Sequence, residues 1–226
     1  MKKIGKVVLH IPAREGSKRV PKKNLRKMNG YPMISYVIKE SLKSNITSDI
    51  YVNTDSLEII SYVKKNFSNC NVYKRPASLA SDESSSEDFN LDIMNSLNAD
   101  TLIMINPVCP LIKSEDIVDA FEKYKESECD TLISCSSTKM QTFCNDIPVN
   151  IKVNEKLAPS QNNKTIKTLN WAITIWDCKS FRDRIKNLGY AVLGKNRLLY
   201  EINLVKSIKV SYEEDFILAE QIIKNY

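Results

Sequence analysis

Short apolar, β-rich runs alternate with amphipathic stretches of helical period through the first two-thirds of this 226-residue chain. An alternation of this kind builds right-handed strand–helix–strand units, which place the strands parallel and cover both faces of the sheet with helices. The sequence therefore predicts an α/β fold with a mainly parallel sheet flanked by helices. Ligands of such sheets bind beyond the carboxyl ends of the strands. The expected strands are 6–12, 50–53, 71–73, 101–105 and 131–136, and the expected helices are 32–44, 56–66, 85–97 and 114–124.

The alternation breaks down between residues 139 and 167, where the chain becomes polar. A short alternating run at 149–153 indicates a hairpin, and we interpret the segment as an excursion from the sheet that serves dimer contacts. The runs 169–176 and 207–210 are expected to return to the core before a last helix begins near Tyr212 and ends near Lys224. Residues 1–226 are expected to form one domain.

Composition excludes several classes of protein. No apolar run reaches the ~20 residues needed to cross a bilayer, and no signal peptide is recognisable, so a cytoplasmic protein without membrane spans is expected. The six cysteines contain no Cys-x-x-Cys pair, and the single histidine, His10, lies in an apolar run. Standard zinc spacings and histidine-activated nucleophiles are therefore absent. We interpret the thiols as reduced and mostly buried, and His10 as a structural residue of a strand interior.

The net charge of +6 is concentrated in one short segment. This segment, residues 14–27, contains seven basic residues and a single acid, Glu15. In the rest of the chain, basic and acidic residues are equal in number. Such concentrated charge suits a compact polyanion such as a nucleoside triphosphate, although a solvated basic loop is an alternative. Nucleic acid is not expected, because no aromatic residues interleave with the cations. The seven are Arg14, Lys18, Arg19, Lys22, Lys23, Arg26 and Lys27.

The same segment follows the first expected strand, where Gly16 and backbone amides can converge on phosphates. It is neither a Walker A loop nor a dinucleotide fingerprint. Its sequence, Ile-Pro-Ala-Arg-Glu-Gly-Ser-Lys-Arg-Val-Pro-Lys-Lys-Asn over 11–24, resembles the N-terminal signature of the acylneuraminate cytidylyltransferase family, whose members activate sialate, legionaminate, pseudaminate and, more distantly, Kdo. The resemblance continues through nearly the whole chain. Its further segments are 53–56, 75–82, 106–111, 170–173 and 214–216.

The resemblance implies a GT-A-like, Rossmann-type nucleotidyltransferase, usually a homodimer, that transfers CMP from CTP to a keto-acid sugar and releases pyrophosphate in surface-glycan biosynthesis. It also implies Mg²⁺ or Mn²⁺ as cofactor. Arg14 and Lys23 would be the catalytic residues that neutralise phosphate oxygens, Arg75 and Ser86 would lie near the cytosine and ribose, and Asn106 would lie near the acceptor sugar. The nucleotide-binding residues implied in this way are Ala13, Arg14, Gly16, Ser17, Lys23, Asn24, Arg75, Ser86 and Asn106.

The chain departs from the family pattern on the metal and acceptor sides. Lys209-Val210-Ser211 stands where the family has Asp-Ile-Asp, whose carboxylates bind the ion, so the metal ligands are unknown. Either Lys209 supplies a fixed positive charge, or one of the acids at 213–215 reaches the ion; we favour compensation of the helix dipole for those acids. Ser211 with Glu214, like Asp55 with Glu58, has the pattern of a capping box.

On the acceptor side, Trp171 stands where the family has glycine, and Thr168 and Ile112 stand where it has arginine. Two functions therefore remain. The leading hypothesis is a cytidylyltransferase whose acceptor is smaller or less acidic than sialate. The alternative is a catalytically silent nucleotide-binding homologue with a partner or regulatory role.

Overall fold

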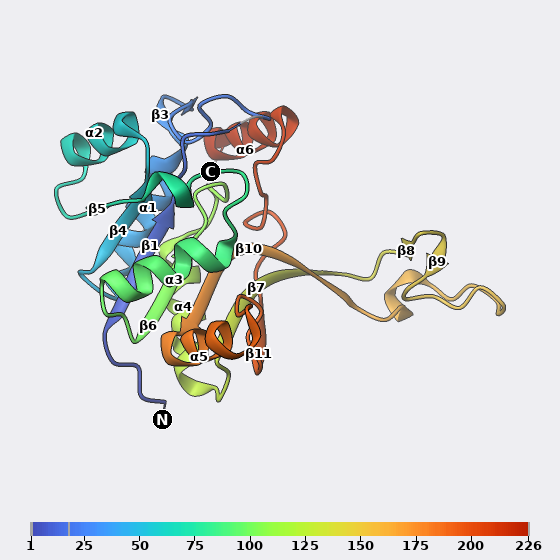
Figure 1. Cartoon of the computed structure of the whole chain (residues 1–226). Coiled ribbons are helices and arrows are strands. Elements are labelled where there is room, and N and C mark those ends of the chain that lie inside the picture. The colour runs from blue at the N-terminus through green and yellow to red at the C-terminus, as the bar shows by residue number, and fades with distance from the viewer. Residues whose placement is uncertain (1, 18, 226) are drawn as a thin grey trace.

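The computed structural model describes residues 2–17 and 19–225. Its main elements, drawn in Figure 1, are β1 (Val7–Pro12), β2 (Lys27–Met28), β3 (Tyr31–Pro32), α1 (Met33–Ser44), β4 (Ile50–Thr54), α2 (Leu57–Asn66), β5 (Asn71–Lys74), α3 (Ser86–Ser96), β6 (Thr101–Ile105), α4 (Ser114–Glu126), β7 (Thr131–Thr138), β8 (Phe143–Cys144), β9 (Ile147–Pro148), β10 (Ile166–Asp177), α5 (Cys178–Leu188), β11 (Arg197–Glu201) and α6 (Glu213–Asn225).

Seven strands form one sheet in the order β11-β7-β10-β6-β1-β4-β5. Every pair in it is parallel except those of β10, which runs antiparallel to both β6 and β7. β7 and β10 are joined by one long excursion that sends the chain straight back beside itself, and such a return pairs strands antiparallel. The mainly parallel α/β sheet is thus confirmed, with one reversed strand that hydrophobic periodicity could not identify.

Helices cover both faces of the sheet, as expected for this fold class (Figure 1). Alternate residues of β1 point to opposite faces, so Leu9 joins the core cluster shared with α1, α2 and α4, whereas Val8 joins the cluster shared with α3 and α5. A third, smaller cluster packs the loop after β1 against α6 and includes Val20 and Phe216. No helix among the described residues is long and apolar enough to cross a bilayer.

The strands and helices expected before residue 139 are all present, with ends that differ by at most two residues. The two-residue strands β2 and β3 were not expected, and two longer elements were missed. α5 buries only Cys178 and Phe181, so it carries little apolar periodicity. β11 is a five-residue edge strand. The run 207–210 forms no strand, although Val210 is buried.

The capping box expected at Asp55 is wrong, because the helix begins one residue later. Ser56 is the N-cap of α2, and its side chain accepts a hydrogen bond from the Ile59 amide. Asp55 instead accepts a hydrogen bond of 3.1 Å from the backbone N–H of Glu15. It therefore ties the loop after β1 to the end of β4.

The interpretation of His10 and the cysteines is confirmed. His10 is fully buried in β1, and neither ring nitrogen has a hydrogen-bond partner among the described residues. All six cysteines are free, and only Cys144 is exposed.

The polar excursion is an arm, residues 139–165, that projects away from the body of the molecule (Figure 1). Its hairpin lies at β8–β9 rather than at 149–153, where no strand forms. The cause is the turn at Asn145 and Asp146, which have positive φ of 47° and 64°. Two-residue hairpin turns favour this conformation, and Asn and Asp tolerate it. The exposed large apolar residues of the arm are Met140, Phe143, Ile147, Val149, Val153 and Leu157.

Candidate active site

Two adjoining cavities lie beyond the carboxyl ends of β1 and β6, where a parallel sheet is expected to bind its ligand. One, of about 550 Å³, is the basic cavity; its polar lining residues, with Gly16, are Arg14, Ser17, Arg19, Lys23, Asn24, Asn106, Lys209 and Ser211. The other, of about 320 Å³, is the aromatic cavity. Its lining residues include Arg75, Ser86, Phe89, Asn90, Met104, Trp171, Trp176 and Val192. The two share Pro12, Arg14, Asn106 and Lys209.

Hydrogen bonds to backbone groups of the loop after β1 hold this loop in place. The Ala13 N–H donates to the carbonyl of Asn53, and the Asn24 side chain donates to the carbonyl of Arg14 at 3.3 Å. Asn24 is buried, and its side-chain oxygen has no partner among the described residues. Asn24 therefore holds the loop in shape at the edge of the basic cavity.

Arg14 links the loop after β1 to the segment that precedes α3. Its guanidinium pairs with Asp82 at 2.8 Å and donates to the Ser81 carbonyl at 3.1 Å. Both groups are partly exposed, so this pair is weakened by solvent. Because Arg14 also lines both cavities, it holds the wall between them in position.

Lys23 is a half-buried cation in a crowd of other cations. Its ammonium donates a hydrogen bond of 2.8 Å to the carbonyl of Val210. Burial lowers the pKa of Lys23 below its ordinary value, and the charges of Arg19 and Lys209 lower it further. Asp215 opposes this shift, but it makes no ion pair with Lys23. The basic cavity is therefore preorganised for an anion.

Arg75 forms the floor of the aromatic cavity. Its guanidinium donates to the Asn53 side chain at 2.8 Å and to the Asn53 carbonyl at 3.1 Å, and it stacks on the Phe89 ring at 4.6 Å. Burial, with the nearby charge of Arg14, lowers the pKa of Arg75 to about 10 against the pull of Asp55. A buried cation beside aromatic rings suits a flat, polar ring such as a nucleobase.

Trp171 lines the aromatic cavity from an irregular point of β10. Its φ is +60°, a left-handed conformation that bulky side chains rarely adopt. The register of β10 against β7 shifts between Leu169 and Thr174, around this residue. The Asn170 side chain accepts bonds from Ser134 and from the Ala172 amide, which holds the irregular backbone in place.

Two of the three acids at 213–215 are engaged elsewhere, and the third, Glu214, is exposed and lines neither cavity. Both carboxylate oxygens of Glu213 accept hydrogen bonds from the Arg26 guanidinium, at 2.5 and 2.6 Å. Asp215 accepts the backbone N–H groups of Ser211 and Tyr212, both at 2.8 Å. The residue that caps α6 is thus Asp215, and the expected partner Glu214 is wrong, because the helix begins at Glu213.

The lining residues do not fit a protein-bound divalent cation. Mg²⁺ is usually held by one or two carboxylates together with substrate phosphates. No described carboxylate lines either cavity, and the part of the chain that the structure describes holds no group of three or more His, Cys, Asp or Glu suited to a metal. The oxygens on offer are the neutral ones of Ser17, Ser211 and the two asparagines.

The structure brings most of the sequence-predicted site residues together. Ala13 is the exception, because its side chain is buried in the core and its amide bonds to Asn53. Lys18 lies outside the described residues. Phe89, Met104 and Trp176 were missed, because buried apolar residues on strands and helices carry no chemical signal of their own. The residues that line a cavity as expected are Arg14, Gly16, Ser17, Lys23, Asn24, Arg75, Ser86 and Asn106.

A mainly parallel sheet with cation-lined cavities at its strand ends defines an α/β protein of the nucleotide-binding type, and solved structures share its fold. A CMP:2-keto-3-deoxy-manno-octonic acid synthetase complexed with CTP superposes with a TM-score of 0.73 at 16% identity, covering 98% of this chain and 99% of that one. A 4-diphosphocytidyl-2C-methyl-D-erythritol synthase from Anaerococcus prevotii superposes with a TM-score of 0.70 at 12% identity, covering 97% and 98%.

The chain belongs to the cytidylyltransferase family, whose model matches residues 8–193. It is 29% identical to the post-translational flagellin modification protein B of Campylobacter coli, over 98% of this chain and 96% of that protein. It is 28% identical to the CMP-N,N'-diacetyllegionaminic acid synthase of Legionella pneumophila, over 97% of each. These findings confirm the family resemblance and the class of enzyme, and they lend no support to a catalytically silent homologue.

Proposed function

We propose that this protein transfers CMP from CTP to the anomeric hydroxyl of a sialic-acid-like keto-acid sugar, related to legionaminic, pseudaminic or sialic acid. The hydroxyl oxygen forms a bond to the α-phosphorus, the bond from that phosphorus to the bridging oxygen breaks, pyrophosphate leaves, and the hydroxyl proton passes to water. Such a transfer needs positioned cations more than a covalent nucleophile, which agrees with a buried, unpartnered His10.

The single observation that carries the proposal is the basic cavity in a chain of the cytidylyltransferase family. Among the residues that the structure describes, cations line this cavity and no Asp or Glu does. Arg14 and Lys23 would hold phosphate oxygens there, with the amides around Gly16. The base and ribose would enter the adjoining aromatic cavity, beside Arg75 and Ser86. Asn106 lines both cavities, at the place where an acceptor hydroxyl would meet the α-phosphate. Since the lining does not fit a metal, the cations of this chain would supply the positive charge that the reaction needs.

The acceptor differs from sialate in size or charge. Trp171 lines the aromatic cavity, where a glycine would leave more room. An acceptor carboxylate is best bound by an arginine fork, and neither Thr168 nor Ile112 can provide one. The product would serve surface-glycan biosynthesis, and the protein would act in the cytoplasm, where CTP is available.

The proposal is tested by incubating the protein with CTP and a panel of keto-acid sugars and measuring CMP-sugar and pyrophosphate. We expect CMP-sugar with at least one acceptor, and in thermal-shift assays a larger increase in melting temperature with CTP than with ATP, GTP or UTP, since a ligand that binds the folded state stabilises it. The Lys27→Met variant is the charge-matched control for Lys23→Met, because Lys27 is exposed and lines neither cavity. Equal shifts with all four nucleotides and no CMP-sugar would overturn the proposal.

The arm, 139–165, would join two copies of this chain. It extends away from the body and exposes six large apolar residues, an arrangement that a second copy would bury (Figure 1). Light scattering tests this: replacing residues 140–164 by a short glycine-serine linker should convert a dimer into a monomer. A monomeric wild-type protein would contradict it.

A further inference from the structure

Lys209 places an unpaired ammonium in the wall shared by the two cavities. Its side chain is exposed and makes no ion pair or hydrogen bond with any residue in 2–17 or 19–225. It stands close enough to Lys23 to help lower the pKa of that residue. Like charges held this close repel one another, so the arrangement is stable only in water or with an anion between them.

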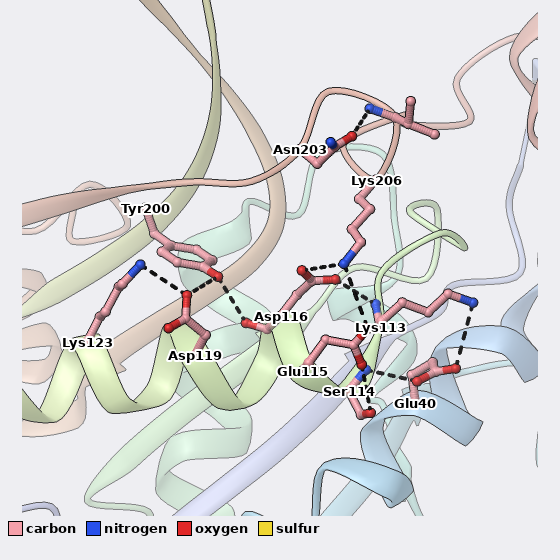
Figure 2. Close-up of polar contacts among 11 residues, drawn as sticks. Glu40, Lys113, Ser114, Glu115, Asp116, Asp119, Lys123, Tyr200, Asn203 and Lys206 are labelled. Carbon is pink, nitrogen blue, oxygen red and sulfur yellow. Dashed lines mark hydrogen bonds and ion pairs between the residues drawn. The ribbon is translucent and has the colours of Figure 1, made fainter.

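The backbone on both sides of Lys209 is fixed. On the N-terminal side, Lys206 pairs with Asp116 at 2.8 Å at the start of α4, as Figure 2 shows. On the C-terminal side, the Val210 amide donates to the Val108 carbonyl at 2.8 Å, and the Val210 carbonyl accepts the bond from Lys23. The chain therefore delivers Lys209 to the cavities from a defined position, while its long side chain stays free to meet a ligand.

Three cations outside the basic and aromatic cavities pair with carboxylates. Lys206 has Asp116, Lys113 has Glu40 at 4.0 Å, and Arg26 has Glu213. Within the two cavities, Arg14 pairs with Asp82, whereas Arg19, Lys23 and Lys209 form no ion pair with any described carboxylate. Three cations without carboxylate partners, gathered at two adjoining cavities, suit an anionic ligand.

We propose that the Lys209 ammonium supplies, directly from the protein, the positive charge that a bound divalent ion would otherwise bring to the triphosphate, so that CTP binds and reacts with no ion held by side chains of this chain. This inference rests on the proposed function. When the bond between the α-phosphorus and the bridging oxygen breaks, its electron pair stays on pyrophosphate, and the added negative charge develops beside Lys23 and Lys209.

Calorimetric titration of CTP, once in EDTA and once in Mg²⁺, tests the proposal. Wild-type Kd values in the two conditions should agree within about threefold, which is less than 1 kcal/mol. In EDTA, Lys209→Met should weaken CTP binding about 10- to 100-fold, the size of one charge-assisted hydrogen bond, and Lys209→Arg should restore most of it. Lys27→Met, which removes the same charge from outside both cavities, should bind as the wild type does. Pyrophosphate release by the wild type should persist in EDTA.

Two outcomes would each overturn the inference. One is a wild-type affinity for CTP that rises more than about tenfold on adding Mg²⁺, or about 1.4 kcal/mol, because the ion would then carry the charge. The other is a Lys209→Met variant with wild-type affinity in EDTA. Since Lys209 is exposed, both variants should fold, and their melting temperatures check this. Either outcome leaves the proposed function standing, because CTP still binds; that function fails instead if CTP binds no more tightly than the other three nucleotides.

Discussion

The ammonium of Lys23 donates its hydrogen bond to a carbonyl that lies 187 positions further along the chain, that of Val210. The bond joins the loop after β1 to the segment that carries Lys209, and both segments line the basic cavity. A ligand that draws on both cations therefore binds to walls already fixed in relation to each other. Folding has therefore already removed part of the conformational entropy that would otherwise be lost when the ligand binds.

Replacing Lys23 by methionine should weaken ligand binding with little net effect on folding. The Val210 carbonyl would lose its partner, which costs about 1–3 kcal/mol for a buried acceptor, but the burial of charge and the like-charge repulsion that lower the pKa of Lys23 would be relieved. CTP binding should fall by about 10- to 100-fold. Differential scanning calorimetry and titration of CTP measure the two effects. Lys27→Met serves as the control, and a Lys23→Met variant with wild-type CTP affinity would refute the role assigned to Lys23.

CTP binding should take up protons at alkaline pH. Burial and neighbouring cations hold the pKa of Lys23 below the ordinary 10.5 in the free protein, so part of the population is neutral before pH 10.5 is reached. Phosphate oxygens favour the charged form and raise that pKa on binding. Affinity should therefore decline as pH rises through the lowered pKa. Titrations across the alkaline range, in buffers of different ionisation enthalpy, measure the uptake.

Lys23→Arg provides the matched comparison, since arginine stays protonated throughout this range. The variant should show less proton uptake than the wild type and a flatter pH dependence of CTP affinity. Equal uptake in the two proteins would show that another group titrates.

Replacing Trp171 should change both the backbone strain at this position and the width of the aromatic cavity. Both Trp171→Gly and Trp171→Ala remove the indole, but only glycine adopts a φ of +60° without strain. The glycine variant should therefore be more stable than the alanine variant by about 1 kcal/mol in urea unfolding. Both should accept bulkier acidic sugars than the wild type does, measured as CMP-sugar formed across the acceptor panel. Equal stability of the two variants, or an unchanged range of acceptors, would count against this account.

The sequence predicted the parts of the fold that local periodicity controls, and it could not predict those that depend on long-range placement. β6 was expected at its observed bounds because a run of buried residues is readable from sequence alone. The reversal of β10 was not predictable, because periodicity carries no strand direction. Phe89 and Trp176 become cavity walls only when α3 and β10 meet. The sequence showed Lys209 as a departure from the family pattern. It could not show that Lys209 has no ion pair among the described residues, because that depends on where the carboxylates lie in the folded chain.

His10 should make the protein less stable as the pH falls below neutrality. Complete burial, with the nearby charge of Arg75, lowers the pKa of His10 to about 3 from 6.5. Between these values the unfolded chain binds a proton at His10 and the folded chain does not. The free energy of unfolding therefore decreases as pH drops through 6.5 and stops decreasing near pH 3. At pH 5 this contribution is about 2 kcal/mol.

The His10→Leu variant isolates this contribution from that of the carboxylates, which also titrate in acid. Leucine is of similar size and buries no polar atom, whereas both ring nitrogens of His10 are buried without a hydrogen bond of normal geometry to any described residue, and the Asn90 side chain beside them only partly offsets the lowering of the pKa of His10. The variant should match or exceed wild-type stability at pH 7.5, and at pH 5 its advantage should grow by about 2 kcal/mol. Urea unfolding at the two pH values measures both differences. Stability curves that stay parallel would mean that His10 is protonated, or reached by water, in the folded protein.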